Sequence, residues 1–582
     1  MNGLRLTISA LLVLLLAVFA FPILYSDHWW STRLSSLVPF GLYSPFADLI
    51  VKNGIVYTSD SSLPFADSFA VRSGRILRVG NYSDIKELVR YGTVELDLGG
   101  KVVVPGFFDS HVHLIFGGLQ MARVEFRGVN RRDEFVKRVK EAAANSEPGS
   151  WIMGGGWNND LWGGELPIAS WIDEATPVNP VWLTRMDGHM GLANSVALKA
   201  ASITSLSEDP EGGAILRTSV GEPTGLLVDS AMKLVLVLIP GVSVEERRNA
   251  FLRASKYALT KGVTTVVDFG RYFPGAPVES SWEDFSDVYQ WADSSRKMVV
   301  RVCLFFPLET WSLLADMTKK LGHAVSQWIY LGGVKAFADG SLGSSSALLH
   351  EPYMDEAQNW GLQVTDTEKL FNLTLASDKS GLQVAVHAIG DKANDLVLDV
   401  FELVNTANGV RDRRFRIEHA QHLKPGTVNR FGQQGIIASV QPDHLLDDAD
   451  SAVKKLGKDR ADKGSYLFRS LLESKTTLAL GSDWPVADID PLGSIRTAMK
   501  RIPRGSDHAW IPSERLSLTE ALNAYTISAA HAVFLDKDLG SLSPGKLADF
   551  VVLSADSWNQ LAAEGSATVV STYLSGTRAY PW

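Results

Sequence analysis

Eight short runs of apolar and β-branched residues alternate with stretches of helical pattern along most of the chain, and no other feature constrains the fold as strongly. Each run is bounded by Gly or Asp and is apolar almost throughout, which is typical of parallel strands buried on both faces. The runs are 101–107, 262–268, 299–306, 332–337, 382–387, 414–419, 435–440 and 476–480. Eight such strands predict an α/β fold of the (β/α)₈ barrel type, with its active site at the carboxyl ends of the strands.

Both ends of the chain predict a smaller β unit. Residues 48–57 and 68–79 have the pattern of short strands, with Asn53-Gly54 and Ser73-Gly74 as hairpin signals. Residues 539–553 and 568–574 have the same pattern at the other end. We therefore expect one composite β-sandwich that both ends of the chain build beside the barrel.

The expected organisation follows from these patterns. The first interval between barrel strands, about 114–261, is far longer than an ordinary connection and predicts a cap inserted over the barrel mouth. The predicted units are a leader and linker at 1–46, the first sandwich part at 47–103, the barrel at 104–537 and the second sandwich part at 538–582.

The N-terminal segment predicts targeting to the secretory pathway. Arg5 precedes an apolar run at 8–24, whose length is near the short limit of roughly 17–25 residues that span a bilayer. This favours a signal peptide or an uncleaved signal anchor, with a buried helix of the fold as the alternative. We expect an anchored or luminal protein of the endoplasmic reticulum or another endomembrane, including the perinuclear one. Asn81 and Asn372 would then be glycan acceptors.

Composition excludes some classes of function. The chain has 56 basic and 65 acidic residues, a net charge of −9, and no long basic run that could neutralise a phosphate backbone. We therefore expect no nucleic-acid partner. The single cysteine, Cys303, excludes an intramolecular disulfide framework and lies in an apolar run, which predicts an inert core thiol.

Six candidate metal ligands fall at or just beyond the ends of the predicted strands. They are His111, His113, Lys335, His387, His419 and Asp483. In an extended segment, residues two apart point to the same side, so His111 and His113 can bind one divalent ion together. Such a pair can equally be structural when it stands alone. His422 is a rival to His419, but it lies three residues past the strand and is more naturally a loop residue.

Lys335 is the unusual member of this set, because a bare ammonium is costly to bury inside a crowded barrel. Addition of CO₂ to its amine would give a carbamate, an anion that can bridge two cations, whereas the alternative is a lysine that points to the surface. The carbamate predicts two divalent ions, with Zn²⁺ as the first candidate. His387 and His419 would hold the second ion as neutral imidazoles.

Asp483 completes a hydrolytic set. One carboxylate oxygen can bind a metal while the other takes a proton from water. A divalent ion such as Zn²⁺ lowers the pKa of its bound water to about 7, so a metal-activated hydroxide serves as the nucleophile without Ser or Cys. The residues therefore predict metal-dependent hydrolysis.

Five stretches of the chain resemble the amidohydrolase superfamily, and specifically its YtcJ-like group, also called amidohydrolase family 3. These stretches are 104–113, 333–341, 416–420, 481–485 and 540–549, and the resemblance extends over 47–578. The resemblance implies the composite sandwich and the cleavage of C–N bonds, other than peptide bonds, in N-substituted amides or related small molecules. Plant members of this group are implicated in phytochrome signalling under far-red light, which the resemblance also implies here.

The insertion resembles the substrate-facing cap of this group at 157–158, 187–191, 209–213 and 223–229. We accordingly expect substrate contacts at Trp157, Asn158, His189, Asp339 and Gln441. His189 is the candidate for polarising a substrate carbonyl, whereas the alternative is that these Gly-rich turns only shape the cap. The group's usual Arg after the fourth strand is replaced here, where 343–346 reads Gly-Ser-Ser-Ser.

Two other functions remain open at this level. The first is a catalytically idle signalling or scaffold protein on the same fold, although all six ligand positions are filled. The second is a mononuclear deaminase in which Lys335 stays a free amine. The sequence leaves the substrate and the oligomeric state open.

Overall fold

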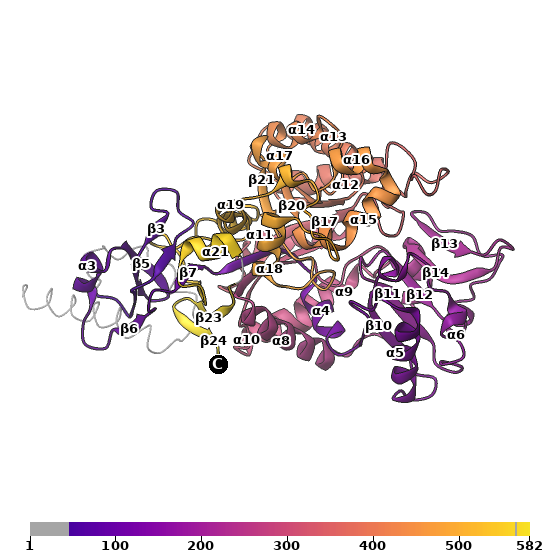
Figure 1. Ribbon diagram of the computed structural model, residues 1–582, viewed down its shortest axis with the longest axis horizontal. Coiled ribbons are helices and arrows are strands. Elements are labelled where there is room, and N and C mark those ends of the chain that lie inside the picture. The colour runs from indigo at the N-terminus through magenta and orange to yellow at the C-terminus, as the bar shows by residue number, and fades with distance from the viewer. Residues whose placement is uncertain (1–45, 565–566) are drawn as a thin grey trace, which may run out of the picture.

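The computed structural model describes residues 46–564 and 567–582, and a ring of eight parallel strands forms its centre (Figure 1). The strands follow one another around the ring in chain order. They are β8 (Phe107–Val112), β15 (Val263–Asp268), β16 (Arg301–Pro307), β17 (Ile329–Phe337), β18 (Gln383–Ala388), β19 (Arg416–His419), β20 (Ile437–Val440) and β21 (Thr477–Leu480). This confirms the predicted barrel.

The loop after β21 brings the last strand back to the first. The Asp483 amide donates to the His111 carbonyl oxygen at 2.7 Å, and the Ser482 amide donates to Asp109 Oδ1 at 2.9 Å. The ring is thus nearly closed, and the segment that closes it carries one of the candidate ligands.

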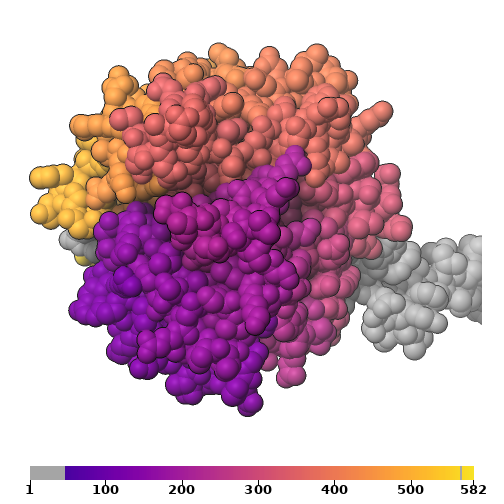
Figure 2. Space-filling model, turned by 90° about the vertical axis from the view of Figure 1, so that its right-hand side faces the viewer, coloured from indigo at the N-terminus to yellow at the C-terminus, as the bar shows by residue number. Residues whose placement is uncertain are grey.

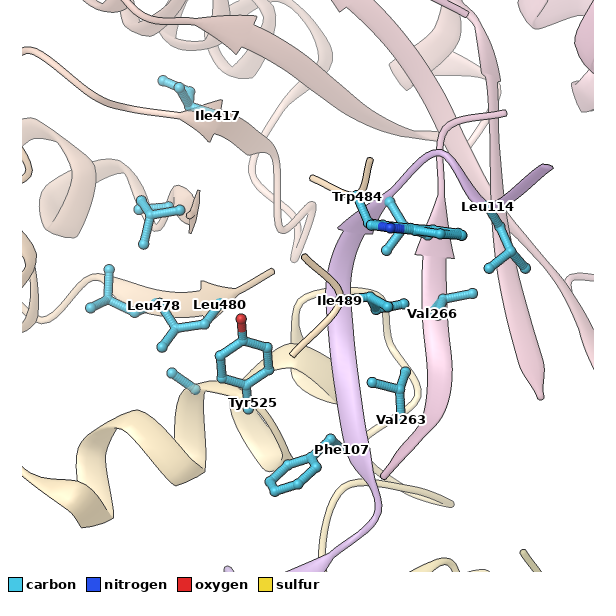
Figure 3. Packing of buried hydrophobic residues seen from close by; sticks show 14 of the residues in the cluster. Phe107, Leu114, Val263, Val266, Ile417, Leu478, Leu480, Trp484, Ile489 and Tyr525 are labelled. Carbon is cyan, nitrogen blue, oxygen red and sulfur yellow. The ribbon is translucent and has the colours of Figure 1, made fainter. Parts of the chain in front are cut away.

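Helices cover the outside of the barrel because their apolar faces match its surface. Helix α8 (Val244–Thr260) begins at Ser243, whose hydroxyl accepts a hydrogen bond from the Glu246 amide at 3.1 Å. Its buried face includes Ala250, Ala254 and Ala258, small residues that let the helix pack close to its neighbours, together with Phe251. Full burial of a residue such as Phe251 contributes roughly 1.5–3 kcal/mol. Figure 3 shows the same core cluster, with Phe107, Val263, Val266 and Ile489 among its labelled members.

The first barrel strand differs from the prediction of 101–107. That run divides into β7 (Val102–Pro105), which belongs to the sandwich, and β8, which belongs to the barrel. The division falls at Gly106, where an added Cβ would lie 2.3 Å from the Thr264 hydroxyl, so the chain passes too close to β15 for any side chain. His111 consequently lies within the first barrel strand and not after it.

The sandwich combines the two ends of the chain, as predicted. Its larger sheet has the order β24-β23-β22-β7-β2-β3, and β22 of the C-terminal part pairs with β7 of the N-terminal part. The smaller sheet has the order β5-β4-β1-β6. The strands are β1 (Leu49–Lys52), β2 (Ile55–Tyr57), β3 (Phe65–Ala66), β4 (Ser68–Arg72), β5 (Arg75–Gly80), β6 (Val94–Asp97), β22 (Phe550–Leu553), β23 (Val569–Leu574) and β24 (Thr577–Tyr580).

The two predicted hairpin turns behave differently. Ser73-Gly74, with φ of 48° and 76°, connects the antiparallel strands β4 and β5, as expected. Asn53-Gly54 does not form a hairpin, because β1 and β2 belong to different sheets. Asn53, at φ 56°, turns the chain from one layer to the other.

The insertion forms a separate sheet on the side of the barrel opposite the sandwich (Figure 1). Its order is β13-β14-β12-β11-β10-β9. The strands are β9 (Val124–Glu125), β10 (Ile152–Trp157), β11 (Val181–Arg185), β12 (Met190–Ala193), β13 (Gly213–Arg217) and β14 (Pro223–Asp229). Figure 2 looks onto this cap, drawn in violet, and shows the later part of the barrel, drawn in orange, beside it. The residue boundaries between these units remain predictions.

The expected secretory or endomembrane location is corrected. Residues 46–564 and 567–582 contain no helix that is long and apolar enough to cross a membrane. The apolar run at 8–24, which prompted the expectation, lies outside the described residues. Of the two predicted glycan acceptors, Asn81 precedes α3 (Tyr82–Ile85) and Asn372 lies within α12 (Thr367–Lys379), and both are exposed. Thr374 of the second acceptor motif is fully buried.

Candidate metal centre

The barrel brings the six predicted metal ligands together. Their side chains come from β8, β17, β18 and β19, from the residue after β8 and from the loop after β21. All six line one pocket of about 50 Å³ at the carboxyl ends of the strands, together with residues of the cap. Five of the six are buried, and His113 is nearly so. The ligand assignments themselves remain predictions.

Asp483 lies at the centre of this group. Its Oδ1 is 3.4 Å from His111 Nε2 and 3.5 Å from His113 Nε2, and it is buried without a hydrogen-bond partner among the described residues. Donor atoms of His111, His419 and Asp483 all lie within 4.8 Å of one another. A buried carboxylate oxygen with no donor is costly, whereas a divalent cation between these atoms would compensate it. The donor set therefore fits a metal ion.

The four histidines are held by hydrogen bonds that leave one nitrogen of each free. In each ring one nitrogen faces an oxygen acceptor: His111 Nδ1 with Glu418 Oε2 at 2.7 Å, His113 Nδ1 with the Gly270 carbonyl at 2.7 Å, His387 Nε2 with the Gly340 carbonyl at 2.9 Å, and His419 Nδ1 with Gln441 Oε1 at 2.8 Å. A nitrogen that faces an acceptor carries the proton, so the other nitrogen keeps its lone pair for a metal.

Burial also keeps these rings neutral. It lowers the pKa of His113 to about 4 and the pKa values of His111, His387 and His419 well below the ordinary value, with nearby cations adding to the effect. Burial raises the pKa of Asp483 to about 7, against the opposing effect of Lys335. Neutral imidazoles are the form that binds divalent metals.

Lys335 points into the barrel, so the surface-pointing alternative does not hold. Its side chain is 1% exposed, and Nζ lies 4.4 Å from the centre of the Phe269 ring and 5.0 Å from that of Phe337. Burial lowers the pKa of Lys335 to about 8, although Glu418 and Asp483 act in the opposite direction. A lysine with this pKa is partly neutral near pH 8, and a neutral amine is the form that reacts with CO₂.

Two of the six residues have unusual backbone conformations. His419 has φ 76° and Asp483 has φ 56°, values in the left-handed region that non-glycine residues rarely adopt. Alternation along β19 would turn His419 to the face opposite Glu418, yet His419 lines the pocket while Glu418 contacts the candidate ligand His111. Such strain costs of order 1–3 kcal/mol per residue and concentrates at functional sites.

The cap contributes a second group of polar side chains through the turn between β11 and β12. His189 Nδ1 lies 2.6 Å from Oδ1 of Asp229, a fully buried residue at the end of β14 with φ 48°. Burial disfavours the charged ring, but Asp229 outweighs it and raises the pKa of His189. His189 lines the same pocket as the metal ligands, with its ring centre 4.9 Å from that of His387. The cap thus places an imidazole beside the candidate metal ligands.

Arg185 and Asp187 fasten this turn to the barrel. The Arg185 guanidinium donates to Asp187 Oδ2 at 2.7 Å, and the hydroxyls of Ser341 and Ser344 donate to the same oxygen at 2.6 and 3.0 Å. Arg185 lies against Gly343, where an added Cβ would be 2.1 Å from Nη1. The guanidinium of Arg185, from the cap, therefore lies beside residues 343–346, the segment in which the family's usual Arg is replaced.

The predicted substrate residues divide into two groups. Asn158 and His189 line the pockets at the site. The other three are buried elsewhere in supporting positions: Trp157 in the cap core, where Nε1 donates to the Leu183 carbonyl; Gln441 behind His419; and Asp339, whose carboxylate accepts from the amides of Leu348, Ile389 and Gly390.

Sequence reasoning missed His444. It belongs to the short helix η8 (Pro442–His444), which follows β20, and its Nε2 is buried, without a hydrogen-bond partner among the described residues, 3.8 Å from Asp483 Oδ2. Its position after the seventh strand, where active-site residues of a barrel gather, was the available signal.

Comparison with known proteins agrees with this geometry. Residues 94–580 match the family described as "Amidohydrolase family". The chain is 64% identical to "Protein LONG AFTER FAR-RED 3" of Arabidopsis thaliana, over 99% of this chain and 98% of the relative. It is 34% identical to "Putative amidohydrolase YtcJ" of Bacillus subtilis (strain 168), over 86% and 93%, and 27% identical to "N-substituted formamide deformylase" of Arthrobacter pascens, over 92% and 98%.

One solved structure is similar over almost the same span. It is an uncharacterised metal-dependent hydrolase from Pyrococcus horikoshii, with a TM-score of 0.69 and 28% sequence identity, and the match covers 87% of this chain and 97% of that one. These likenesses confirm the resemblance found in the sequence.

Proposed function

The chain belongs to the amidohydrolase family, and from that premise we propose that it hydrolyses a C–N bond, other than a peptide bond, in a small amide-like molecule. One observation carries the proposal. Asp483 places a buried oxygen without a donor within 3.5 Å of two imidazole nitrogens. The name of the Arthrobacter relative, a deformylase of N-substituted formamides, supports the choice of bond.

We infer two divalent ions, with Zn²⁺ as the first candidate, because six possible ligands line one pocket and nitrogen and carboxylate oxygen donors are the ligands that Zn²⁺ takes. His111 and His113 would hold one ion and His387 and His419 the other. Reaction of the neutral Lys335 amine with CO₂, with release of one proton, would supply a carbamate as an anionic oxygen ligand for these ions. When bound, such ions polarise a carbonyl oxygen and bring the pKa of water to about 7.

Asp483 performs the proton transfers, and His189 polarises the substrate carbonyl. Asp483 accepts the proton of the attacking water at Oδ2 and returns it to the nitrogen of the departing amine. His189 donates from Nε2 toward the substrate carbonyl oxygen, while Asp229 fixes the proton on Nδ1 and favours the charged ring. Asp187 holds the cap turn against the barrel segment of Ser341 and Ser344, beside the pocket.

A mononuclear site is the second candidate. His111, His419 and Asp483 form a compact set that suits a single ion, and Lys335 lies over two aromatic rings without an ion pair among the described residues. In this case Lys335 would remain a free amine and the reaction would be deamination. We further propose a role in far-red light signalling, which the name of the Arabidopsis relative supports.

Hydrolysis of a panel of N-acyl, N-formyl and cyclic amides by the purified protein tests the proposal. We expect amine release that a chelator abolishes and added Zn²⁺ restores. The variant His111→Ala should be inactive, and His508→Ala, which changes an exposed histidine, should be unaffected. Hydrolysis that persists in His111→Ala, or a fully metallated protein inactive on every amide, would contradict it.

A further inference from the structure

The pocket around the candidate ligands is too small for a whole substrate. Its volume is about 50 Å³, and the neighbouring polar pocket that includes Asn158 and Asp448 has about 40 Å³. A cavity needs about 10–15 Å³ of such volume to hold one water molecule. The reacting amide group can therefore enter, but any substituent must occupy other space.

A much larger cavity adjoins this pocket. It has a volume of about 470 Å³ and lies between the cap and the barrel, with walls from α4 (Leu114–Gln120), β10, β11 and the segments at 236–242 and 271–283. Its size is within the range of about 300–1,000 Å³ that is usual for small-molecule sites. Phe116, Thr184 and Phe273 line both this cavity and the ligand-lined pocket.

The walls of the large cavity are mainly apolar and partly aromatic. Phe116 and Phe273, which line both spaces, have ring centres 5.7 Å apart, and Trp182, Met153 and Ile239 lie farther along the wall. Aromatic rings favour edge-to-face or offset contacts with another ring. Cap and barrel both contribute to these walls, so the shape of the cavity depends on how the cap sits on the barrel.

From these observations we propose that this cavity binds an apolar arm of the substrate, of the size of a bicyclic aromatic ring, which passes Phe116 and Phe273 while the amide group reaches Asp483. The inference rests on the proposed function, because it names the substrate class of the same site. The substrate is then an N-substituted or acyl amide with one large apolar group. Simple amides fill only the small pocket and lack the binding energy of the arm.

Binding of N-phenyl-1-naphthylamine, a neutral apolar probe whose fluorescence rises on leaving water, tests the cavity without any need for turnover. We expect saturable binding to the full chain that Ile239→Trp and Met153→Trp each weaken at least tenfold by filling the cavity. The matched control Leu313→Trp, at an exposed position of α11 (Trp311–Leu321), should bind like wild type. Absence of binding, or equal binding in all variants, would overturn the inference.

Kinetics with two amides then connects the cavity to the site. For N-(1-naphthylmethyl)formamide, Ile239→Trp should raise KM at least tenfold, whereas kcat/KM for N-methylformamide should stay within twofold. Equal effects on both amides would overturn the inference. The failure of this inference and the failure of the proposed function are distinguishable. If wild type binds the probe, Ile239→Trp weakens that binding and neither amide is hydrolysed, the apolar cavity stands and the proposed hydrolysis does not.

Discussion

The barrel wall and the cap wall of the pocket are built in different ways. The barrel supplies the candidate ligands from the ends of several strands, and a hydrogen bond to a backbone or side-chain oxygen holds each of the four histidines. The cap supplies His189 from a turn that a strained Asp229 and the Asp187 contacts fasten to the barrel. The difference indicates a division of work. The barrel should determine metal content, whereas the cap should determine turnover and the choice of substrate.

The largest effect on activity is expected at Asp483, which is both a candidate metal ligand and the proposed base. Asp483→Asn keeps an oxygen for the metal but cannot accept a proton, so kcat should fall by about 10²–10⁴-fold while most of the metal remains. Steady-state kinetics with elemental analysis measures both quantities. A variant with near-normal kcat would exclude Asp483 as the base.

Lys335→Ala tests whether the barrel holds its metal through the proposed carbamate on Lys335. It should lower metal content and activity together, and short carboxylates such as acetate or propionate should restore part of both by taking the place of the carbamate. Full metal content with full activity would show that Lys335 bridges nothing and would favour the mononuclear site.

A matched pair of supporting variants sharpens the comparison between the walls. Gln441→Leu removes the partner of His419 and should weaken metal affinity by about 10–100-fold, the usual effect of losing such a support. Asp229→Asn removes the carboxylate partner of His189 and should lower kcat by about 10–100-fold with metal affinity unchanged. Metal titrations and kinetics on both variants check this. Loss of metal in the cap variant would contradict the division.

The smallest effect is expected far from both walls. Cys303 is 1% exposed on β16, and burial raises the pKa of its thiol to about 12. Cys303→Ser should leave kcat unchanged and lower the free energy of unfolding by about 1–3 kcal/mol, because a hydroxyl is placed in an apolar core. Chemical denaturation and the amide assay measure the two. A large loss of activity would contradict the assignment of Cys303 as an inert core thiol.

The barrel ligands were accessible to sequence reasoning because they depend on local periodicity. Seven of the eight predicted strands overlap the observed ones, and a residue at a strand end can be placed at the site without knowing any distant contact. The first strand was misplaced because the apolar run 101–107 continues from a sandwich strand into a barrel strand without a change of pattern. The break between the two strands falls at Gly106, where the chain passes close to Thr264.

The cap residues were only partly predictable. His189 lines the pocket, but its contact with Asp229, 40 residues away in the sequence, depends on the pairing of β12 with β14. Trp157 and Asp339 lie in segments that resemble the family. Their sequence neighbours do not indicate that Trp157 packs in the cap core or that the Asp339 carboxylate accepts hydrogen bonds from backbone amides. His444 went unnoticed because no repeated spacing marks it.

Elemental analysis of the purified protein tests the central claim, that the strand ends of the barrel form a metal centre. We expect two divalent ions per chain in wild type and in Asp229→Asn, and substantial loss of both in His111→Ala. A wild-type protein without stoichiometric divalent metal, or His111→Ala with the full wild-type content, would contradict it.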